Sequence, residues 1–451
     1  MDISVISLQD VAQAERLMRE IGVDPGGIEI MAPKSVTRLV MVRRLPIFAA
    51  NILKQETLSL GADTAVSRQA LTGKAAHTDC LIIGSLSHYR RLCEKLRRQP
   101  YGLSRLSLDL ETVLSNYQKN DFILDLGRYK LNLQSHTHIM GIINLTPDSF
   151  SGDGLYKSQK SKVKSQNLRA LHNRHLVIAR SGSDEAISDG DCFAPSRLAM
   201  TARGFSGGLN LNNIVDYARK LVDEGADILD IGGESSRPGA RPVPLKEELL
   251  RVIPAIKAIG KKLKIPLSVD TSKSEVARQA LDNGALIVND ITALNGDPGM
   301  LRIVKRYKAA VALMHMKGRP HTMQKNPRYG CFMREVCGYL KQAMDKALEA
   351  GVDRKRIILD PGIGFGKSLE HNLEIIKSLG RLKALGQPIL IGLSRKSFLG
   401  KITGKETVSR VFAGISANCL AVINGARIVR VHDVQETRDS LKVLDRILKC
   451  Q

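Results

Sequence analysis

The stretch RIILDPGIGFG, residues 356–366, sets the pattern from which the fold is predicted. A short run of Ile and Leu ends in one carboxylate, Asp360, and a glycine-rich loop and a helical stretch follow. Strands that are apolar on both faces are typical of parallel sheets, because helices cover such sheets on both sides. The flanking sequence therefore decides whether this stretch is one unit of a repeat.

The same unit of apolar strand, polar tip and helix recurs from His138 to the C-terminus. Repeats of this kind predict an α/β fold of the (β/α)8 TIM-barrel class, in which all strands are parallel and closed into a barrel. Barrel enzymes hold their active sites at the carboxyl ends of the strands, so the polar tips are the candidate site. The other expected strands are IMGIIN (139–144), DILDIGG (227–233), PLSVDT (266–271), LIVND (286–290), AVALMHM (310–316), PILIGLS (388–394) and RIVRVHD (427–433).

Residues 1–120 alternate short apolar runs with helical stretches and predict a smaller α/β domain ahead of the barrel region, residues 121–451. They contain no glycine-rich phosphate loop and no cluster of metal ligands, so the sequence assigns them no role. The segment FILDLGRYKLNL (122–133) predicts a β-hairpin around its Gly-Arg turn. In the first domain, strands are expected at ISVIS (3–7), GIEIM (27–31), RLVMV (38–42) and CLIIGS (80–85), and a helix at 46–61.

About fifty residues, roughly 157–208, interrupt the first repeat between its strand and its helix. They begin KSQKSKVKSQ and carry only isolated apolar residues in no periodic order. A segment of this composition cannot bury enough surface to offset the entropy of ordering it. We expect a disordered surface insertion; the alternative is a basic docking arm.

The overall composition limits the classes of partner. The 68 Lys and Arg exceed the 45 Asp and Glu by +23, which favours anionic ligands. Aromatic residues make up only 4%, without Trp, so the stacking platforms of nucleic-acid binders are scarce and no nucleic-acid partner is expected. The seven cysteines are widely spaced without a CxxC pair, as in a reduced cytoplasmic protein. No signal peptide or apolar run of membrane-spanning length is present, so no membrane partner is expected.

Polar side chains at the strand tips indicate the kind of ligand. Asp270, Asn289 and Asp360 end three apolar strands, where a carboxylate or amide is costly to bury without hydrogen-bond donors. A planar heterocycle rich in N–H groups would supply these donors. Asn144, at the end of the first strand, offers an amide oxygen of the kind that helps to hold Mg²⁺.

Cationic residues follow the last two strands. Arg395, Lys396 and Ser397 stand at an expected helix N-terminus, and Arg430 and His432 end the final strand. Arginine forks and exposed helix N–H groups match phosphate oxygens, so together these residues indicate a diphosphate site. Taken singly, each of them, like Arg237 on the loop after the second strand, is also compatible with an ordinary ion pair or turn.

The order of these motifs resembles that of the dihydropteroate synthase family of pterin-binding barrels. The resemblance covers residues 121–451 without the insertion and includes the hairpin as a plug at the barrel bottom. It implies condensation of 6-hydroxymethyl-7,8-dihydropterin diphosphate with 4-aminobenzoate to 7,8-dihydropteroate and pyrophosphate, with Mg²⁺ as cofactor, in a cytoplasmic homodimer. The matching motifs are NLTPDSFSGDG (144–154), DILDIGGESSRPGA (227–240), SVDTSK (268–273), VNDI (288–291), LDPGIGFGK (359–367), LSRKSF (393–398) and RVHDV (430–434).

The resemblance also implies a role for individual residues. Asp153 and Arg237 would order the first two loops, and with Asp270 and Lys396 they form the expected catalytic set. Ser236 stands where the family more often has Thr and keeps the hydroxyl. The implied contacts are Asp270, Asn289, Met314, Asp360 and Lys396 for the pterin, Arg430 and His432 for the diphosphate, Phe150, Pro238, Phe365, Lys396 and Ser397 for aminobenzoate, Asn144 for Mg²⁺, and Ser236 as a further substrate-binding residue.

Two alternatives remain at this point. A methyltetrahydrofolate corrinoid methyltransferase would share the Asp and Asn tips, but it would have no use for Arg430 and His432. A catalytically silent barrel could instead act as a basic binding module through residues 1–120 and the insertion.

Overall fold

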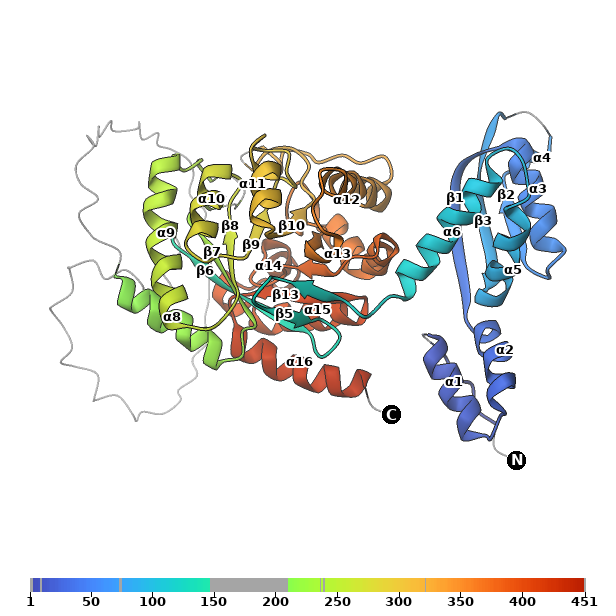
Figure 1. The fold of residues 1–451 in the computed structure, drawn as a ribbon, viewed down its shortest axis with the longest axis horizontal. Coiled ribbons are helices and arrows are strands. Elements are labelled where there is room, and N and C mark those ends of the chain that lie inside the picture. The colour runs from blue at the N-terminus through green and yellow to red at the C-terminus, as the bar shows by residue number, and fades with distance from the viewer. Residues whose placement is uncertain are drawn as a thin grey trace, which may run out of the picture.

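The computed structural model describes residues 3–8, 10–72, 75–146, 210–235, 237, 240–320 and 322–449. Two α/β parts lie side by side and are joined by a long helix (Figure 1). The expected insertion at 157–208 lies outside the described residues.

The second part is the predicted barrel. Its eight strands are hydrogen-bonded in parallel in a closed ring in which β6 joins β13, so the (β/α)8 prediction is confirmed. The strands are β6 (His138–Asn144), β7 (Ile228–Gly232), β8 (Leu267–Asp270), β9 (Ile287–Asp290), β10 (Ala310–Met314), β11 (Ile357–Asp360), β12 (Ile389–Ile391) and β13 (Ala426–Val431).

Helices surround this ring because each presents an apolar stripe to the strands. The helix that follows the insertion, for example, buries Ile214, Val215, Ala218 and Leu221 on one face. The helices are α8 (Leu211–Asp223), α9 (Leu245–Lys262), α10 (Ser274–Asp282), α11 (Met300–Tyr307), α12 (Phe332–Glu349), α13 (Leu369–Ser378), α14 (Ser397–Thr403), α15 (Val411–Ile423) and α16 (Val434–Leu448), with short 3-10 turns η2 (Arg354–Arg356), η3 (Leu379–Leu385) and η4 (Thr407–Ser409).

The predicted hairpin closes the amino-terminal end of the barrel. β4 (Ile123–Asp125) pairs antiparallel with β5 (Lys130–Asn132). Phe122, Leu124 and Leu133 share one buried cluster with side chains of the barrel interior. The bottom of the barrel is therefore an apolar plug, and polar ligands have to enter from the opposite end.

The first part is a small antiparallel sheet with helices. Its strand order is β1-β3-β2, and the core lies between this sheet and the helices. The elements are α1 (Val11–Glu20), α2 (Pro25–Ser35), β1 (Thr37–Pro46), α3 (Ile47–Leu58), β2 (Asp63–Val66), α4 (Arg68–Leu71), β3 (His77–Ser85), α5 (Leu86–Leu96) and α6 (Leu103–Gln118).

Two strand predictions in this part were wrong. Residues 27–31 lie in α2, because Asp24 caps the helix and Pro25 occupies its first turn, which is a helix-start signal stronger than a five-residue apolar run. Residues 3–7 form no strand; Ile3 and Val5 are exposed and pair with no neighbouring strand. The strands at 38–42 and 80–85 and the helix within 46–61 are confirmed.

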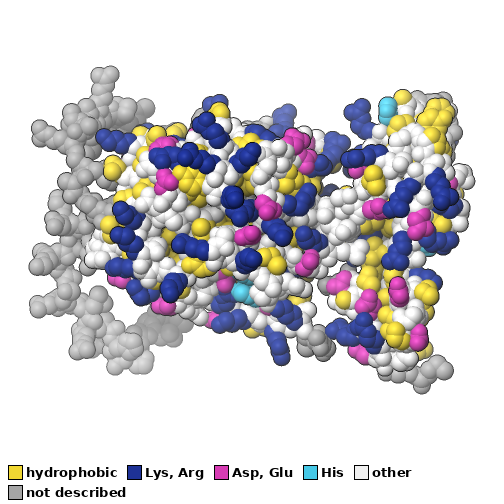
Figure 2. Space-filling view, in the orientation of Figure 1, with side chains coloured by type: hydrophobic (Ala, Val, Ile, Leu, Met, Phe, Trp, Pro, Cys, Tyr) yellow, Lys and Arg dark blue, Asp and Glu magenta, His cyan; other side chains and the backbone are white. Residues whose placement is uncertain are grey.

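The joining helix α6 attaches the first part to the barrel. Asn116 Nδ2 donates to the carbonyl oxygen of Ala384 at 3.0 Å. The centre of the Tyr117 ring lies 5.5 Å from the Arg38 guanidinium and 4.9 Å from the Lys383 ammonium. On the face drawn in Figure 2, Lys and Arg side chains are spread over both parts and interleaved with acidic ones.

Candidate active site at the barrel mouth

The alternation of each strand places the polar tips inside the barrel. Ile358 on β11 and Ile428 on β13 belong to the buried interior cluster. Two residues further along the same strands, Asp360 and Arg430 have the same inward direction, because side chains alternate with a period of two. The apolar lower layers thus support a polar upper layer at the mouth.

A buried ion network connects three of the predicted residues. Arg430 donates through Nε to Asp230 Oδ2 at 2.6 Å and through Nη2 to Asp270 Oδ2 at 2.8 Å. Asn289 Nδ2 donates to the same Asp230 oxygen at 3.0 Å. Asp230, which the sequence analysis did not single out, is therefore the centre of the network.

The environment of Asp270 favours a ligand with hydrogen-bond donors. Burial raises the pKa of its carboxyl to about 7, against the opposing effect of Arg430, and the charges of Asp230 and Glu248 add to the rise. Burial likewise raises the pKa of Asp360. A bound N–H donor would stabilise both carboxylates.

Asp360 is held by the glycine-rich loop that follows it. Its Oδ1 accepts from the backbone N–H of Gly362 at 2.7 Å. Gly362 has a φ of +70°, and a Cβ there would lie 2.0 Å from the carbonyl oxygen of His315, so only glycine fits. The loop then returns to the mouth, where Lys396 Nζ donates to the carbonyl oxygen of Ile363 at 2.9 Å.

An apolar wall lies beside these polar groups. Met314, at the tip of β10, packs in one buried cluster with Met323 and Phe365. The Lys396 ammonium lies 4.6 Å from the centre of the Phe365 ring. Met314, Phe365 and Lys396 are thus brought together at the mouth.

The tips of β12 and β13 form a cationic rim. Burial, together with the charges of Arg395, Arg430 and Arg237, lowers the pKa of His432 to about 3. His432 Nδ1 lies 3.2 Å from Ser394 Oγ. The arginines that surround His432 also attract an anion. Ser397 is exposed at the start of α14, next to Lys396.

Asn144 lies at the end of β6 opposite Gly232 of β7. A Cβ at Gly232 would be 3.4 Å from Asp270 Cβ and 3.8 Å from Asn144 Oδ1, so the missing side chain allows these two groups to converge. An amide oxygen beside a carboxylate is a donor set that fits Mg²⁺, which completes its shell with water and phosphate oxygens.

The loop residues are only partly described. Arg237 lies close enough to Lys396 and His432 for its charge to lower the pKa of each. Phe150, Asp153, Ser236 and Pro238 lie outside the described residues.

Two further supports of the mouth were missed in the sequence. Lys367 is 3% exposed, and its Nζ contacts His315 Nδ1 at 2.8 Å and the carbonyl oxygen of Phe365 at 3.0 Å, which ties the glycine-rich loop to β10. Lys273 pairs with Glu248 and Glu234 below the loop that carries Arg237. The available signal was a lysine that ends an otherwise apolar or small-residue motif, in LDPGIGFGK and in SVDTSK.

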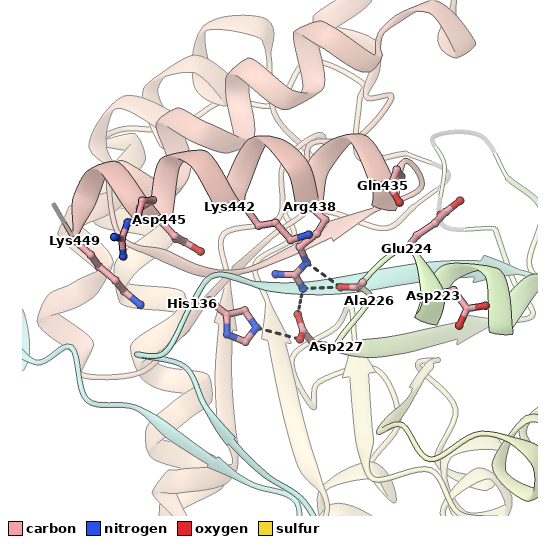
Figure 3. A pocket seen from close by; sticks show the side chains of 12 residues that line it. His136, Asp223, Glu224, Ala226, Asp227, Gln435, Arg438, Lys442, Asp445 and Lys449 are labelled. Atoms are coloured by element: carbon pink, nitrogen blue, oxygen red, sulfur yellow. Dashed lines mark hydrogen bonds and ion pairs between the residues drawn. The ribbon is translucent and has the colours of Figure 1, made fainter.

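A large cavity lies at the opposite end of the barrel. It has a volume of about 630 Å³ between α16 and the turn that precedes β7, and His136 and Asp227 line it (Figure 3). His138 lies close enough to these two residues to complete a group of three candidate metal ligands. Asp227 already accepts from His136, from the backbone N–H of Ile139 and from Arg438, whose guanidinium takes the place of a cation. We therefore interpret this group as a structural tie between β6, β7 and α16.

Comparison with known proteins agrees with this geometry. The family model described as pterin binding enzyme matches residues 200–432. The dihydropteroate synthase of Synechocystis sp. is 38% identical over 325 residues, which are 72% of this chain and 94% of that protein.

A solved structure and a longer relative extend the likeness. The dihydropteroate synthase of Xanthomonas albilineans, solved with 4-aminobenzoic acid, is 36% identical with a TM-score of 0.58 over 73% of this chain and 100% of that one. A probable bifunctional folylpolyglutamate synthase/dihydropteroate synthase of Halobacterium salinarum is 34% identical over 98% of this chain and 46% of that protein, so its match includes most of residues 1–120. A closed barrel with carboxylates, an amide and a cationic rim at its mouth, and relatives matched over nearly their full length, together show that the chain belongs to the dihydropteroate synthase family.

Proposed function

We propose that the chain joins 4-aminobenzoate to 6-hydroxymethyl-7,8-dihydropterin diphosphate, giving 7,8-dihydropteroate and pyrophosphate. The observation that carries the proposal is that two kinds of binding group lie together at the barrel mouth. Buried hydrogen-bond acceptors lie at the ends of β8, β9 and β11, and a cationic rim lies at the ends of β12 and β13. A substrate with an N–H-rich ring and an anionic leaving group matches both.

The acceptors would bind the ring. Asp270 and Asp360 offer carboxylate oxygens, and Asn289 offers its amide oxygen because its Nδ2 is engaged by Asp230. Met314 would cover one face of the ring. These contacts favour a heterocycle with N–H groups, because a ligand that lacks such a donor would leave a buried acceptor of the site unpaired.

The rim would hold the diphosphate. Arg430 and His432 supply donors from β13 and its end, and Asn144 would hold Mg²⁺ together with phosphate oxygens. The ion, when bound, would neutralise charge on the leaving group. Stabilising the charge that develops as the group departs is the main catalytic task of these residues.

The chemistry exchanges one bond for another. The bond between the pterin methylene carbon and the diphosphate oxygen breaks, the amine nitrogen of aminobenzoate forms a bond to the same carbon, and the amine loses a proton. Asp270 and Asp360 would stabilise the positive charge that spreads into the ring. Phe365, Lys396 and Ser397, with Phe150 and Pro238, would hold aminobenzoate. Ser236 would be a further substrate contact, and Asp153 and Arg237 would order the loops that exclude water.

Pyrophosphate release tests the function directly. With the pterin diphosphate, Mg²⁺ and 4-aminobenzoate together, we expect sustained release and formation of dihydropteroate. Omitting aminobenzoate or chelating Mg²⁺ should suppress turnover. A protein that is folded by circular dichroism but releases no pyrophosphate would contradict the proposal.

Substitutions of two adjacent residues at the start of α14 should affect the binding of the two substrates differently. Lys396→Ala removes both the donor to the Ile363 carbonyl and the cation over Phe365, so it should weaken the pterin diphosphate and aminobenzoate by about tenfold each. Ser397→Ala should raise only the KM for aminobenzoate, by about fivefold. Calorimetric titration of each ligand checks the contrast; equal effects of Ser397→Ala on both ligands would contradict this division.

The remaining expectations concern the setting of the enzyme. No helix among the described residues is both long and apolar enough to cross a membrane. Cys80, Cys93, Cys331, Cys337 and Cys419 are free thiols. We propose a cytoplasmic homodimer whose partners are the two substrates rather than nucleic acid.

A further inference from the structure

Asp230 occupies an unusual place for a carboxylate. It lies in the middle of β7, opposite Ile142 of β6 and Ser268 of β8, and its exposed fraction is 0%. The strand alternation directs it into the barrel, one layer below the tips of the neighbouring strands. From there it can contact residues of the mouth without reaching the mouth itself.

Its first effect is on Asn289. A carboxylate accepts hydrogen bonds and does not donate them, so the Asn289 amide has to present its nitrogen to Asp230 Oδ2 at 3.0 Å. The other end of the amide is then an oxygen, an acceptor with no partner among the described residues. Asp230 thereby orients the Asn289 amide so that its oxygen is available to a hydrogen-bond donor of the ligand.

Its second effect is on Arg430. The Nε bond to Asp230 at 2.6 Å and the Nη2 bond to Asp270 at 2.8 Å fix the plane of the guanidinium. The Nη1 donors are left without an acceptor among the described residues. A guanidinium fixed in this way is preorganised for binding an anion, since the side chain loses little further conformational entropy when the anion binds.

The remaining oxygen of Asp230 shows that packing alone does not explain the residue. Oδ1 is buried and accepts no hydrogen bond from any described residue. An unpaired buried oxygen costs stability, and such costs are concentrated at functional sites. An apolar residue would fill this layer of the barrel without that cost.

We propose that Asp230 is a positioning residue that orients Asn289 toward the pterin ring and Arg430 toward the diphosphate. The inference deepens the proposed function and rests on it for the identity of the ligands. Asp230 touches neither substrate. It should therefore affect both halves of the pterin diphosphate and leave aminobenzoate unaffected, because Phe365 and Ser397 make no contact with it.

The test is Asp230→Asn, which keeps the shape and removes the charge that fixes both partners. We expect the Kd of 6-hydroxymethylpterin and the Kd of pyrophosphate each to rise about tenfold, with the Kd of 4-aminobenzoate within about twofold of wild type. Asp227→Asn is the matched control, because it weakens a second Asp–Arg pair at the other end of the barrel. It should lower the melting temperature without changing any of the three Kd values.

The outcomes separate this inference from the function it rests on. Wild-type turnover is measured first, and its absence would overturn the proposed function alone, since the three Kd values are measured without turnover. Wild-type affinities in folded Asp230→Asn, or equal loss for all three ligands, would overturn the positioning role. If Asp230→Asn does not fold, Asp230→Ser, which leaves room for water, takes its place. Failure of both to fold would assign Asp230 to stability alone and overturn the proposal.

Discussion

Asp360→Ala is expected to lower kcat/KM for the pterin diphosphate roughly 30-fold or more, which corresponds to a loss of about 2 kcal/mol of transition-state stabilisation. The side chain is 6% exposed at the tip of β11, and its Oδ1 already accepts from Gly362. Its Oδ2 accepts from no described residue and is free for a ring N–H. Alanine would leave that donor buried without a partner and would also release the glycine-rich loop.

Two further variants separate these causes. Asp360→Asn keeps an oxygen for Gly362, so it should hold the loop while still weakening the pterin ring. Asp345→Ala removes an exposed carboxylate paired with Lys341 and should leave kcat/KM unchanged. Steady-state pyrophosphate release checks all three proteins, and wild-type kinetics for Asp360→Ala would remove Asp360 from the site.

The barrel was predictable because its physical signal is repetitive. The strands are buried on both faces and are mainly apolar, so a polar residue near the end of a strand marks the mouth. Asp270, Asn289, Asp360 and Arg430 were found in this way. Asp230, in the middle of β7, departs from this pattern. The rule needs no knowledge of which strands are neighbours.

Neighbour relations were the part that could not be predicted. Asp230 and Arg430 are 200 residues apart in sequence, and they meet only because the barrel closes between β13 and β6. A carboxylate within DILDIGG has no visible partner in the sequence. Lys367 was missed for the same reason, since its partner His315 lies 52 residues away, just after β10.

The first part of the chain was predicted less well because its strands are short and half exposed. In β1, exposed and partly buried residues alternate, and the apolar run GIEIM resembles that pattern although it is helical. Propensity is a weak guide at this length, and the local signal of Asp24 and Pro25 determines the outcome.

Arg430→Met should have the second large effect, on stability as well as on activity. The side chain is the cationic partner of Asp230, with 0% exposure, and of Asp270, with 13%. Removing one member of a buried ion group leaves uncompensated charge and costs about 3 kcal/mol or more. Loss of the diphosphate contacts should also lower kcat/KM about 100-fold.

The destabilisation should depend on pH in a defined direction. Burial already raises the pKa of Asp270 to about 7, and Arg430 is the main group that opposes the rise. Without Arg430 the folded pKa moves further above the unfolded value of about 4, so the folded state of the variant binds more protons than the unfolded state. Below pH of about 7 Asp270 is protonated in both folded proteins, so this added penalty of the variant is absent. It grows as pH rises above about 7 toward the further raised folded pKa of the variant.

Urea unfolding of wild type and variant at pH 5 and pH 8 measures this difference. We expect the loss of unfolding free energy caused by Arg430→Met to be larger at pH 8. Arg278→Met is the matched control, because Arg278 also contacts two carboxylates, Glu275 and Asp282, but on the surface. Exposed pairs contribute less than about 1 kcal/mol, so the control should show a small loss that is similar at both pH values. An equal loss at both pH values for Arg430→Met would mean that Asp230 and Asp270 find other partners when the arginine is removed.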